Sequence, residues 1–213
     1  DPKIGDAEVS YEESQSAMTI VNSKGLKLSY KEVYAMLVAD AVAKDENDTR
    51  TGFGYQFGQS LNDFNIDELA KKCCEDAIKS LNGTQCDSKK YKVLLAPNVF
   101  ASFANVLLSS VSGDAVNRGK SLLKDKLNQQ VASSKLTIVE NPHSKEHPYF
   151  YRAFDDEGVA TMKKAIVEKG VLKTFLYNIE EAKQAKVKST GNGYGGSVIG
   201  VSTSFVEVKP GKK

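Results

Sequence analysis

The sequence predicts an α+β protein with antiparallel or mixed sheets, a few packed helices and two sub-domains. Strand-like alternation of apolar and polar residues dominates residues 7–60, and one strongly amphipathic helix follows it. Strands and helix pairs then mix without the regular strand–helix alternation of a doubly wound sheet. A polar stretch, Gly83–Lys90, separates the two parts. We therefore expect one sub-domain over residues 1–85 and a second over residues 86–213.

The first part is expected to be a β-meander, because apolar and β-branched residues recur between turn signals. Its strands are predicted at Ala7–Tyr11, at Ala17–Val21, along one long bent strand from Leu26 to about Ala43, and at Thr51–Gly58. Asn22–Gly25 and Asp45–Asp48 supply residues that favour turns. The last strand alternates glycine with aromatic residues, which predicts that its bare face lies close to another backbone.

The clearest helix begins after Asn65 or Asp63, since either residue can act as an N-cap. Its apolar residues recur at i, i+3, i+4 and i+7 and so form one stripe: Ile66, Leu69, Ala70, Cys73, Cys74, Ala77, Ile78 and Leu81. Gly83 stands where a left-handed residue is expected at the end of a helix. Cys73 and Cys74 therefore lie on the predicted buried face, which favours packing over reactivity.

The second part mixes further strands and helices. Strands are predicted at Tyr91–Ala96, Lys135–Glu140 and Ser197–Val208, and helices at Val99–Val111 and about 121–132. Two apolar runs around Glu168-Lys169-Gly170 predict a β-hairpin over residues 164–177, because glycine adopts the positive φ of a tight connection. Asn178 is the expected N-cap of a short helix, Ile179–Lys186, and Glu181 can complete a capping box.

Composition and charge exclude several classes of protein. The 213 residues include 29 basic and 27 acidic side chains, a net charge of +2, without the clustered basic face of a nucleic-acid-binding protein. No run of about 18 apolar residues is present, so no transmembrane helix is expected. The three cysteines lack metal-ligand spacing and favour reduced thiols in a cytoplasmic protein. The chain begins with Asp1-Pro2 rather than Met, which indicates a fragment of a longer protein.

One glycine-rich motif matches a known pattern by letter but not by context. Gly191–Gly196 reads G-x-G-x-x-G, the dinucleotide-binding fingerprint. That fingerprint needs a strand before it and a helix after it, so that the helix N-terminus meets the pyrophosphate. Here a short helix precedes the motif and a strand follows it, so a flexible or backbone-binding loop is the favoured interpretation.

A histidine motif raises a second alternative. His143–His147 reads H-x-x-E-H, in which two histidines on one helix share zinc with a glutamate as the base. Pro142 and Pro148 bracket the motif and leave room for about one helical turn. We favour an exposed polar loop here, and a zinc peptidase that uses His143, Glu146 and His147 stays an alternative.

The acidic run Asp155-Asp156-Glu157 also has two interpretations. Three carboxylates can serve as acid/base groups or bind a cation through oxygen. Three consecutive acids followed by Gly158 are more typical of a solvated turn.

The stretch Phe154–Gly196 carries the most specific pattern in the chain. Asp155–Thr161 reads D-D-E-G-x-x-T, the predicted hairpin bends at Glu168-Lys169-Gly170, and Ser189–Asn192 reads S-T-G-N. In this order the three pieces resemble the TldD/PmbA family, whose members are peptidase-complex subunits and were historically called modulators of DNA gyrase. The resemblance covers most of the chain. It implies part of the family's N-terminal domain over residues 1–85 and the first part of its C-terminal domain over residues 86–213.

The family has two branches, and the resemblance favours one of them. TldD-like members resemble zinc peptidases and carry H-E-x-x-x-H on a helix just before a Gly-Asp pair. Counted back from Gly113-Asp114, those positions are Ala104, Asn105 and Ser109. A methyl group cannot bind zinc and an amide cannot act as a general base, so the chain resembles the PmbA-like (TldE-like) branch. No catalytic residue, cofactor or metal site is therefore expected.

The resemblance implies a non-catalytic subunit that binds an extended peptide and a TldD-like metallopeptidase subunit. We expect a dimer with neither a nucleic-acid nor a membrane partner. Asp156, Glu157, Gly158 and Asn192 are predicted to line the peptide-binding surface, where strand-like backbone pairing would hold the peptide at a sheet edge. Two alternatives stay open: the zinc peptidase built on His143, and a stand-alone binding or scaffold protein.

Overall fold

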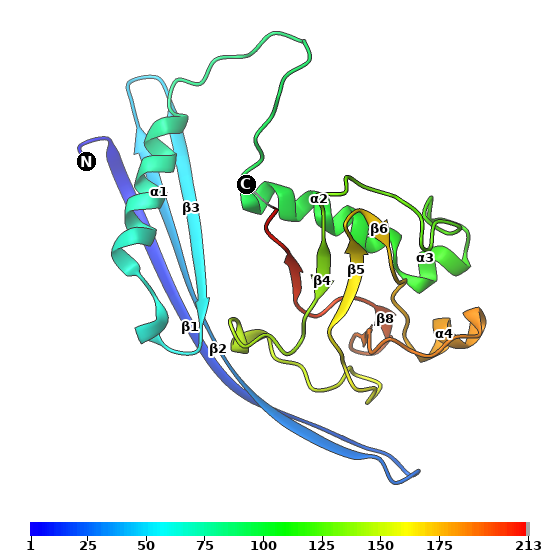
Figure 1. Cartoon of the computed structure of the whole chain (residues 1–213). Helices are drawn as coiled ribbons and strands as arrows, with labels where there is room; N and C mark the ends of the chain where they lie inside the picture. The colour runs from blue at the N-terminus through cyan, green and yellow to red at the C-terminus, as the bar shows by residue number, and fades with distance from the viewer. Residues whose placement is uncertain (212–213) are drawn as a thin grey trace. The chain divides into compact units, whose positions relative to one another are not determined.

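Antiparallel sheets with helices packed on them make up the computed structural model, which describes residues 1–211 (Figure 1). The predicted α+β class is confirmed. The chain forms two compact units, one from Asp1–Ser16 with Lys31–Lys92, and the other from Ala17–Tyr30 with the residues from Val93 onward. Among residues 1–211, no helix has the length and apolar composition that crossing a bilayer requires.

The sheet that begins the chain has three strands in the order β1-β2-β3. These strands are β1 (Ile4–Val21), β2 (Lys27–Lys44) and β3 (Thr49–Gly58). The strands predicted at Ala7–Tyr11 and Ala17–Val21 are one continuous strand, because no glycine or proline interrupts the residues between them. The single long strand predicted after Gly25 is confirmed as β2.

Glycines in β3 lie where helix α1 (Ile66–Ser80) packs against the strand. A Cβ atom on Gly52 would stand 1.9 Å from the carbonyl oxygen of Cys73, and one on Gly54 would stand 2.7 Å from the Leu69 side chain. Neither distance is possible for a real side chain. The predicted close approach of this strand to another backbone is therefore confirmed.

Helix α1 follows a short 3₁₀ helix, η1 (Leu61–Asp63), and begins as predicted. Asn65 is its N-cap, and the Asn65 side-chain oxygen accepts a hydrogen bond from the Glu68 N–H at 3.1 Å. Its buried residues belong to the predicted apolar stripe: Leu69, Cys73 and Ala77. The left-handed residue at its end is Asn82 (φ 56°) and not Gly83. Asp48 explains the difference, because its carboxylate accepts a hydrogen bond from the Asn82 N–H at 2.7 Å.

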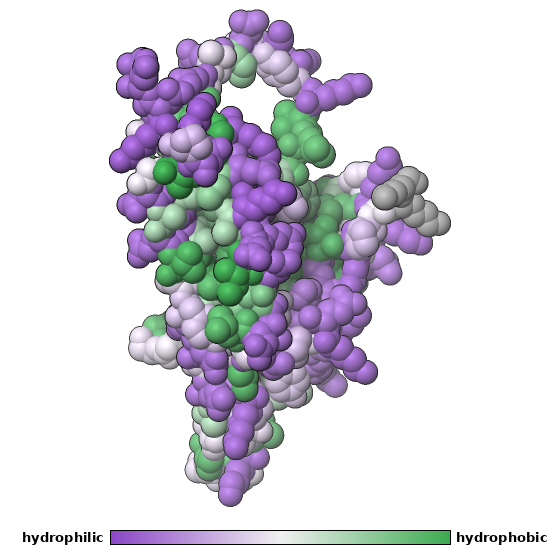
Figure 2. Space-filling view, turned by 90° about the vertical axis from the view of Figure 1, so that its left-hand side faces the viewer, coloured by the Kyte–Doolittle hydropathy of each residue, from purple (hydrophilic) through white to green (hydrophobic). Residues whose placement is uncertain are grey.

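The far end of the β1–β2 hairpin, Ala17–Tyr30, belongs to the second unit. The ring of Tyr30 packs edge-on against Phe154 with centroids 4.9 Å apart, and its hydroxyl accepts a hydrogen bond from Arg152 Nη1 at 2.7 Å. This end of the hairpin lies at the bottom of Figure 2, where hydrophilic and hydrophobic residues are exposed side by side.

The second unit contains the remaining helices and two further sheets, in the strand orders β6-β5-β4-β9 and β7-β8. Its helices are α2 (Pro97–Ser110), α3 (Gly113–Asn117), the 3₁₀ helix η2 (Pro148–Phe150) and α4 (Ile179–Ala185). Its strands are β4 (Ile138–Glu140), β5 (Lys164–Glu168), β6 (Val171–Leu172), β7 (Gly193–Tyr194), β8 (Gly200–Val201) and β9 (Val206–Val208).

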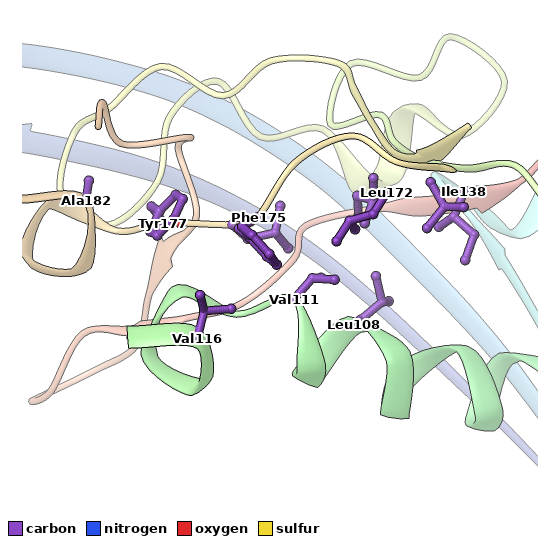
Figure 3. Close-up of a cluster of buried hydrophobic side chains, with 11 residues drawn as sticks. Leu108, Val111, Val116, Ile138, Leu172, Phe175, Tyr177 and Ala182 are labelled. Atoms are coloured by element: carbon purple, nitrogen blue, oxygen red, sulfur yellow. The ribbon is translucent and has the colours of Figure 1, made fainter. Parts of the chain in front are cut away.

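One hydrophobic core joins α2, α3 and α4 to the four-stranded sheet (Figure 3). Leu108 at the end of α2 faces Leu172 of β6. The chain after α2 approaches residues 175–177 through Gly113, whose N–H donates a hydrogen bond to the Leu176 carbonyl oxygen at 2.7 Å. A Cβ atom on Gly113 would stand 2.4 Å from the Tyr177 ring, so this approach requires glycine.

Two local predictions in the second unit are confirmed. The β5–β6 hairpin turns through Lys169 (φ 47°) and Gly170 (φ 79°). Asn178 is the N-cap of α4, and its side-chain oxygen accepts a hydrogen bond from the Glu181 N–H at 2.8 Å. The predicted capping box also needs the Glu181 side chain to accept a hydrogen bond from the Asn178 N–H. The Glu181 carboxylate instead accepts a hydrogen bond from the Asn117 side chain at 2.6 Å.

The helix predicted at about 121–132 is wrong, because this segment is a series of turns. Asn128 has a left-handed φ of 62°, and its N–H donates a hydrogen bond to the Leu172 carbonyl oxygen at 2.8 Å. The Leu172 N–H in turn donates to the Gln129 carbonyl oxygen at 3.0 Å. Backbone pairing with β6 has replaced the hydrogen bonds that a helix would form.

Two predicted strands also differ from the structure. Tyr91–Ala96 is irregular, and Leu94 is 99% exposed. A strand needs a neighbour for its backbone groups, and within residues 1–211 none pairs with this run. The strand predicted at Ser197–Val208 is divided into β8 and β9, because Ser202 and Ser204 bond to the glycine loop and to Glu140 instead of continuing the sheet.

Candidate functional site

Two loops and a helix terminus converge beside strands β4 and β5. They are the acidic turn (Asp155–Gly158), the glycine loop (Ser189–Gly193) and the start of α4 at Ile179. Asp155 joins the two loops, because its fully buried carboxylate accepts hydrogen bonds from the N–H groups of Glu157, Val159 and Gly193 at 3.1, 2.9 and 2.8 Å. Three backbone donors on one carboxylate fix the conformation of the turn and its distance from the loop.

The next residues of the acidic turn add further links. The Asp156 N–H donates to the Gly193 carbonyl oxygen at 2.8 Å, and its carboxylate accepts a hydrogen bond from the Gly195 N–H at 2.8 Å. Gly158 has a φ of 79°, and a Cβ atom there would stand 2.6 Å from the side chain of Leu26. Glycine at this position therefore satisfies both a backbone requirement and a packing requirement.

Glu157 connects the turn to helix α4. Its carboxylate accepts a hydrogen bond from the Ile179 N–H at 2.7 Å, at the helix end where unpaired N–H groups favour negative charge. Burial nevertheless raises the pKa of this carboxyl above its ordinary value, and the neighbouring charges of Asp155 and Glu180 raise it further. The glycine loop closes over it, since a Cβ atom on Gly193 would stand 2.5 Å from a Glu157 carboxylate oxygen.

Asn192 lies at the centre of a buried polar network and is itself 0% exposed. Its side-chain nitrogen donates to both carboxylate oxygens of Glu140, at 2.9 and 3.1 Å, and to the Ser202 carbonyl oxygen at 2.8 Å. Its side-chain oxygen accepts from Lys164 Nζ at 3.1 Å and from the Thr190 hydroxyl at 2.7 Å. Every polar atom of the Asn192 side chain is therefore engaged inside the fold.

The ion pair between Glu140 and Lys164 completes this network, and sequence reasoning missed it. Lys164 Nζ lies 2.5 Å from the Glu140 carboxylate, and the two side chains are 11% and 1% exposed. The two residues are direct cross-strand partners in β4 and β5. The available signal was a pair of opposite charges, one ending the apolar run Ile138-Val139 and the other opening the run Ala165–Val167.

The four residues predicted to line a peptide-binding surface are thus brought together by hydrogen bonds among their own loops. Asp156, Glu157 and Gly158 are partly exposed, whereas Asn192 is buried. The arrangement makes Asn192 a residue that positions the loop from within. A peptide-binding role for the four residues stays a prediction.

The histidine motif lies in the loop before η2 and not on a helix. His143 Nε2 lies 3.0 Å from the Thr161 hydroxyl, and His147 Nδ1 lies 2.7 Å from the Tyr149 hydroxyl. Each ring thus contacts a hydroxyl group, and the two rings do not share one helical face. Across residues 1–211, no group of three His, Cys, Asp or Glu side chains is arranged to hold a metal ion.

A cavity of about 200 Å³ opens beside the end of α2. Its lining residues come from α2, the chain after it, Leu176, and β8 with the two residues that follow it: Asn105, Leu108, Ser109, Ser112, Leu176, Val201, Ser202 and Thr203. Asn105 and Ser109, two of the three positions counted back from Gly113, belong to this lining. Ala104, the third position, is buried at 8% exposure.

Family models match the chain over nearly its whole length. The PmbA/TldA metallopeptidase central domain matches residues 1–81, and the PmbA/TldA metallopeptidase C-terminal domain matches residues 88–213. The chain belongs to the PmbA/TldD family.

Relatives in this family are similar over most of the chain. A metalloprotease PmbA homologue of Buchnera aphidicola is 30% identical over 90% of this chain and 43% of that protein. A metalloprotease of Methanocaldococcus jannaschii is 29% identical over 99% of this chain and 48% of that protein. The chain therefore spans about half the length of the PmbA/TldD relatives that it matches.

Solved PmbA/TldD structures share the fold. A Thermotoga maritima protein named as a candidate modulator of a DNA gyrase superimposes with a TM-score of 0.91 at 31% identity, over 100% of this chain and 49% of that chain. TldE from Thermococcus kodakarensis superimposes with a TM-score of 0.80 over 97% of this chain and 47% of that chain. At 24% identity, the similarity to TldE is evidence for a shared fold alone.

The zinc that the PmbA/TldD metallopeptidase name implies can be tested against the residues present. Zinc in proteins is bound by thiolate, imidazole and carboxylate groups. The cavity lining and Ala104 offer only an amide, hydroxyls and alkyl groups. These residues do not fit a zinc ion, and no reaction step through a metal is assigned to them.

Proposed function

We propose that this PmbA/TldD chain is the non-catalytic subunit of a peptide-processing metallopeptidase complex. The observation that carries the proposal is the set of side chains at the end of α2. Asn105 and Ser109 face a cavity at two of the positions that the resemblance assigns to the general base and a zinc ligand, and Ala104 takes the position of the other ligand. A methyl group cannot bind zinc, an amide cannot act as a general base, and a lone serine hydroxyl is a poor zinc ligand.

The acidic turn and the glycine loop support the peptide-binding part of the proposal. Hydrogen bonds through Asp155 and Asn192 fix both loops, and a preorganised surface loses little entropy when a ligand binds. Asp156, Glu157 and Gly158 lie on the partly exposed side of this assembly. In this role an extended peptide is held by backbone pairing, while Asn192 keeps the glycine loop in place from behind.

The complex in this proposal contains a second family member that carries the H-E-x-x-x-H helix, and hydrolysis takes place there. We propose a heterodimer in the cytoplasm, where the three cysteines, all free in the structure, stay reduced. The relatives' names describe metalloproteases, and the catalytic activity in those names is not carried to this chain because of its residues at positions 104, 105 and 109.

A zinc measurement on the purified chain tests the proposal. The chain is dialysed against zinc and then against buffer, and its metal content is measured by mass spectrometry. We expect far less than one zinc per chain and no hydrolysis of a fluorogenic peptide. Stoichiometric zinc with peptide hydrolysis would overturn the proposal, and loss of both in His143→Ala would establish the histidine-motif alternative.

A reconstitution tests the partner. The chain is co-expressed with a family member from the same genome that carries H-E-x-x-x-H, and the mixture is purified through a tag on this chain. We expect co-purification, together with peptide hydrolysis that depends on the partner's metal motif. Failure of the two proteins to associate would favour the stand-alone binding or scaffold alternative.

A further inference from the structure

The cavity at the end of α2 holds hydrogen-bonding groups that the fold itself does not use. Among residues 1–211, the side chains of Asn105, Ser112, Ser202 and Thr203 form no hydrogen bond to another part of the chain. Ser109 differs from them, because its hydroxyl donates to the Val106 carbonyl oxygen at 2.8 Å. Convergent, unengaged polar groups in a concave surface are the usual mark of a ligand site.

The lining carries no formal charge. Besides the amide and the hydroxyls it consists of Leu108, Leu176 and Val201. Leu108 and Leu176 are 9% and 1% exposed, so the floor of the cavity is part of the hydrophobic core. A charged group that reached this floor would lose part of its hydration without meeting an opposite charge, which disfavours its binding. The cavity therefore selects against lysine, arginine, aspartate and glutamate side chains.

The size of the cavity limits the ligand further. Its volume is about 200 Å³, and a cavity of about 150 Å³ lined by apolar groups accepts a benzene molecule. One aromatic ring with a small substituent therefore fills it. The apolar floor suits the ring, and the amide and hydroxyls suit a hydroxyl group at its edge.

We propose that this cavity is a specificity pocket for an uncharged, ring-sized side chain of the bound peptide, with tyrosine as the best match. Its lining includes Asn105 and Ser109, two of the positions that the family resemblance assigns to the zinc-binding helix. The inference rests on the proposed peptide-binding function.

Nuclear magnetic resonance titration of the ¹⁵N-labelled chain with capped amino acids tests the pocket. The probes are N-acetyl-tyrosinamide, N-acetyl-phenylalaninamide and N-acetyl-lysinamide. We expect saturable shifts at the Asn105 side-chain amide and at the Ser112 and Thr203 backbone amides, with tyrosinamide binding tightest and lysinamide binding at least about fivefold more weakly, as the charge argument requires. Equal shifts with lysinamide, or no shifts at these residues, would overturn the proposal.

Two variants separate the pocket from other surfaces. Asn105→Ala removes one hydrogen-bonding group and should weaken tyrosinamide binding about three- to tenfold, while phenylalaninamide binding changes less. Asn98→Ala, in the exposed first turn of the same helix, is the matched control and should change neither. Ser109→Phe fills the cavity and should abolish the shifts. If circular dichroism shows that this variant misfolds, the comparison of tyrosinamide binding between Asn105→Ala and Asn98→Ala tests the pocket.

The outcome is separable from that of the zinc measurement. Zinc binding with intact tyrosinamide binding would reject the non-catalytic role and keep the pocket. Absence of both zinc and tyrosinamide binding would keep the non-catalytic role and reject the pocket.

Discussion

The side-chain nitrogen of Asn192 donates to both carboxylate oxygens of Glu140, at 2.9 and 3.1 Å, in a site that excludes solvent from both residues. These residues are 52 positions apart in the sequence. The contact ties the glycine loop to the central strand β4, while Lys164 neutralises the carboxylate. The position of the candidate peptide-binding surface therefore depends on a charge that is paired inside the protein.

Asn192→Asp should destabilise the second unit strongly. The substitution replaces a donor with a second carboxylate beside buried Glu140, and we expect a loss of about 3 kcal/mol or more in the free energy of unfolding at pH 7. Urea unfolding followed by far-ultraviolet circular dichroism measures it. Asn98→Asp, an exposed change of the same chemistry in the first turn of α2, is the control and should be neutral or slightly stabilising. Similar stabilities of the two variants would contradict the buried network.

Gly52→Ala should destabilise the first unit. The added Cβ atom would stand 1.9 Å from the Cys73 carbonyl oxygen, so α1 must move away from β3 and open a gap in the core. Overpacking of this kind costs about 1–3 kcal/mol. Gly83→Ala is the control, because the nearest atom to its Cβ would lie at 3.6 Å. Thermal unfolding of both variants should show a lower melting temperature only for Gly52→Ala.

The three cysteines should differ in their rates of reaction with a thiol reagent. Burial raises the pKa of the Cys73 thiol, and Cys73 donates a hydrogen bond to the Ala39 carbonyl oxygen at 3.3 Å. Cys86 is exposed and Cys74 is intermediate. We expect Cys86 to react fastest and Cys73 only when the first unit opens, because the thiolate is the reactive form. Timed alkylation with peptide mapping measures the order, and rapid labelling of Cys73 in the native chain would contradict it.

Glu157→Gln should change how stability depends on pH. Burial raises the pKa of Glu157 in the folded chain above the ordinary value of 4.5, so the native state binds this proton more tightly than the unfolded state does. The folded chain should therefore lose stability as the pH rises from 4.5 through the folded pKa. Glutamine has no such titration, and its side-chain oxygen can still accept the Ile179 N–H.

The measurement for Glu157→Gln is the free energy of unfolding of both proteins at pH 4 and pH 7. The other titrating groups are common to the two proteins, so their contributions to the free energy of unfolding cancel when the two proteins are compared. The variant should gain stability relative to the natural chain between the lower and the higher pH. A relative loss over that interval would show that the carboxylate is stabilised by its partners more than it is penalised by burial.

The sequence predicted those helices and turns that are specified by residues close together in the chain. The i, i+3, i+4 stripe and Asn65 specify α1, Asn178 caps α4, and Gly170 permits the tight turn of the β5–β6 hairpin. The glycines of β3 also predicted a close neighbour, because glycine in a strand often marks a place where another backbone approaches closely. Hydrophobic period, caps and φ preferences act within a few residues, so a sequence displays them directly.

Tertiary structure alone decided the features that join distant segments. Tyr91–Ala96 has a strand-like composition, but within residues 1–211 no strand pairs with it, and the segment around Asn128 forms backbone hydrogen bonds with β6 instead of a helix. The Glu140–Asn192 contact and the pocket built from α2, Leu176 and β8 have no local signature. Whether a polar group is buried, paired or left free depends on partners that only the folded chain brings within reach. For this physical reason the sequence predicted several residues of the candidate site but not the contacts that these residues make.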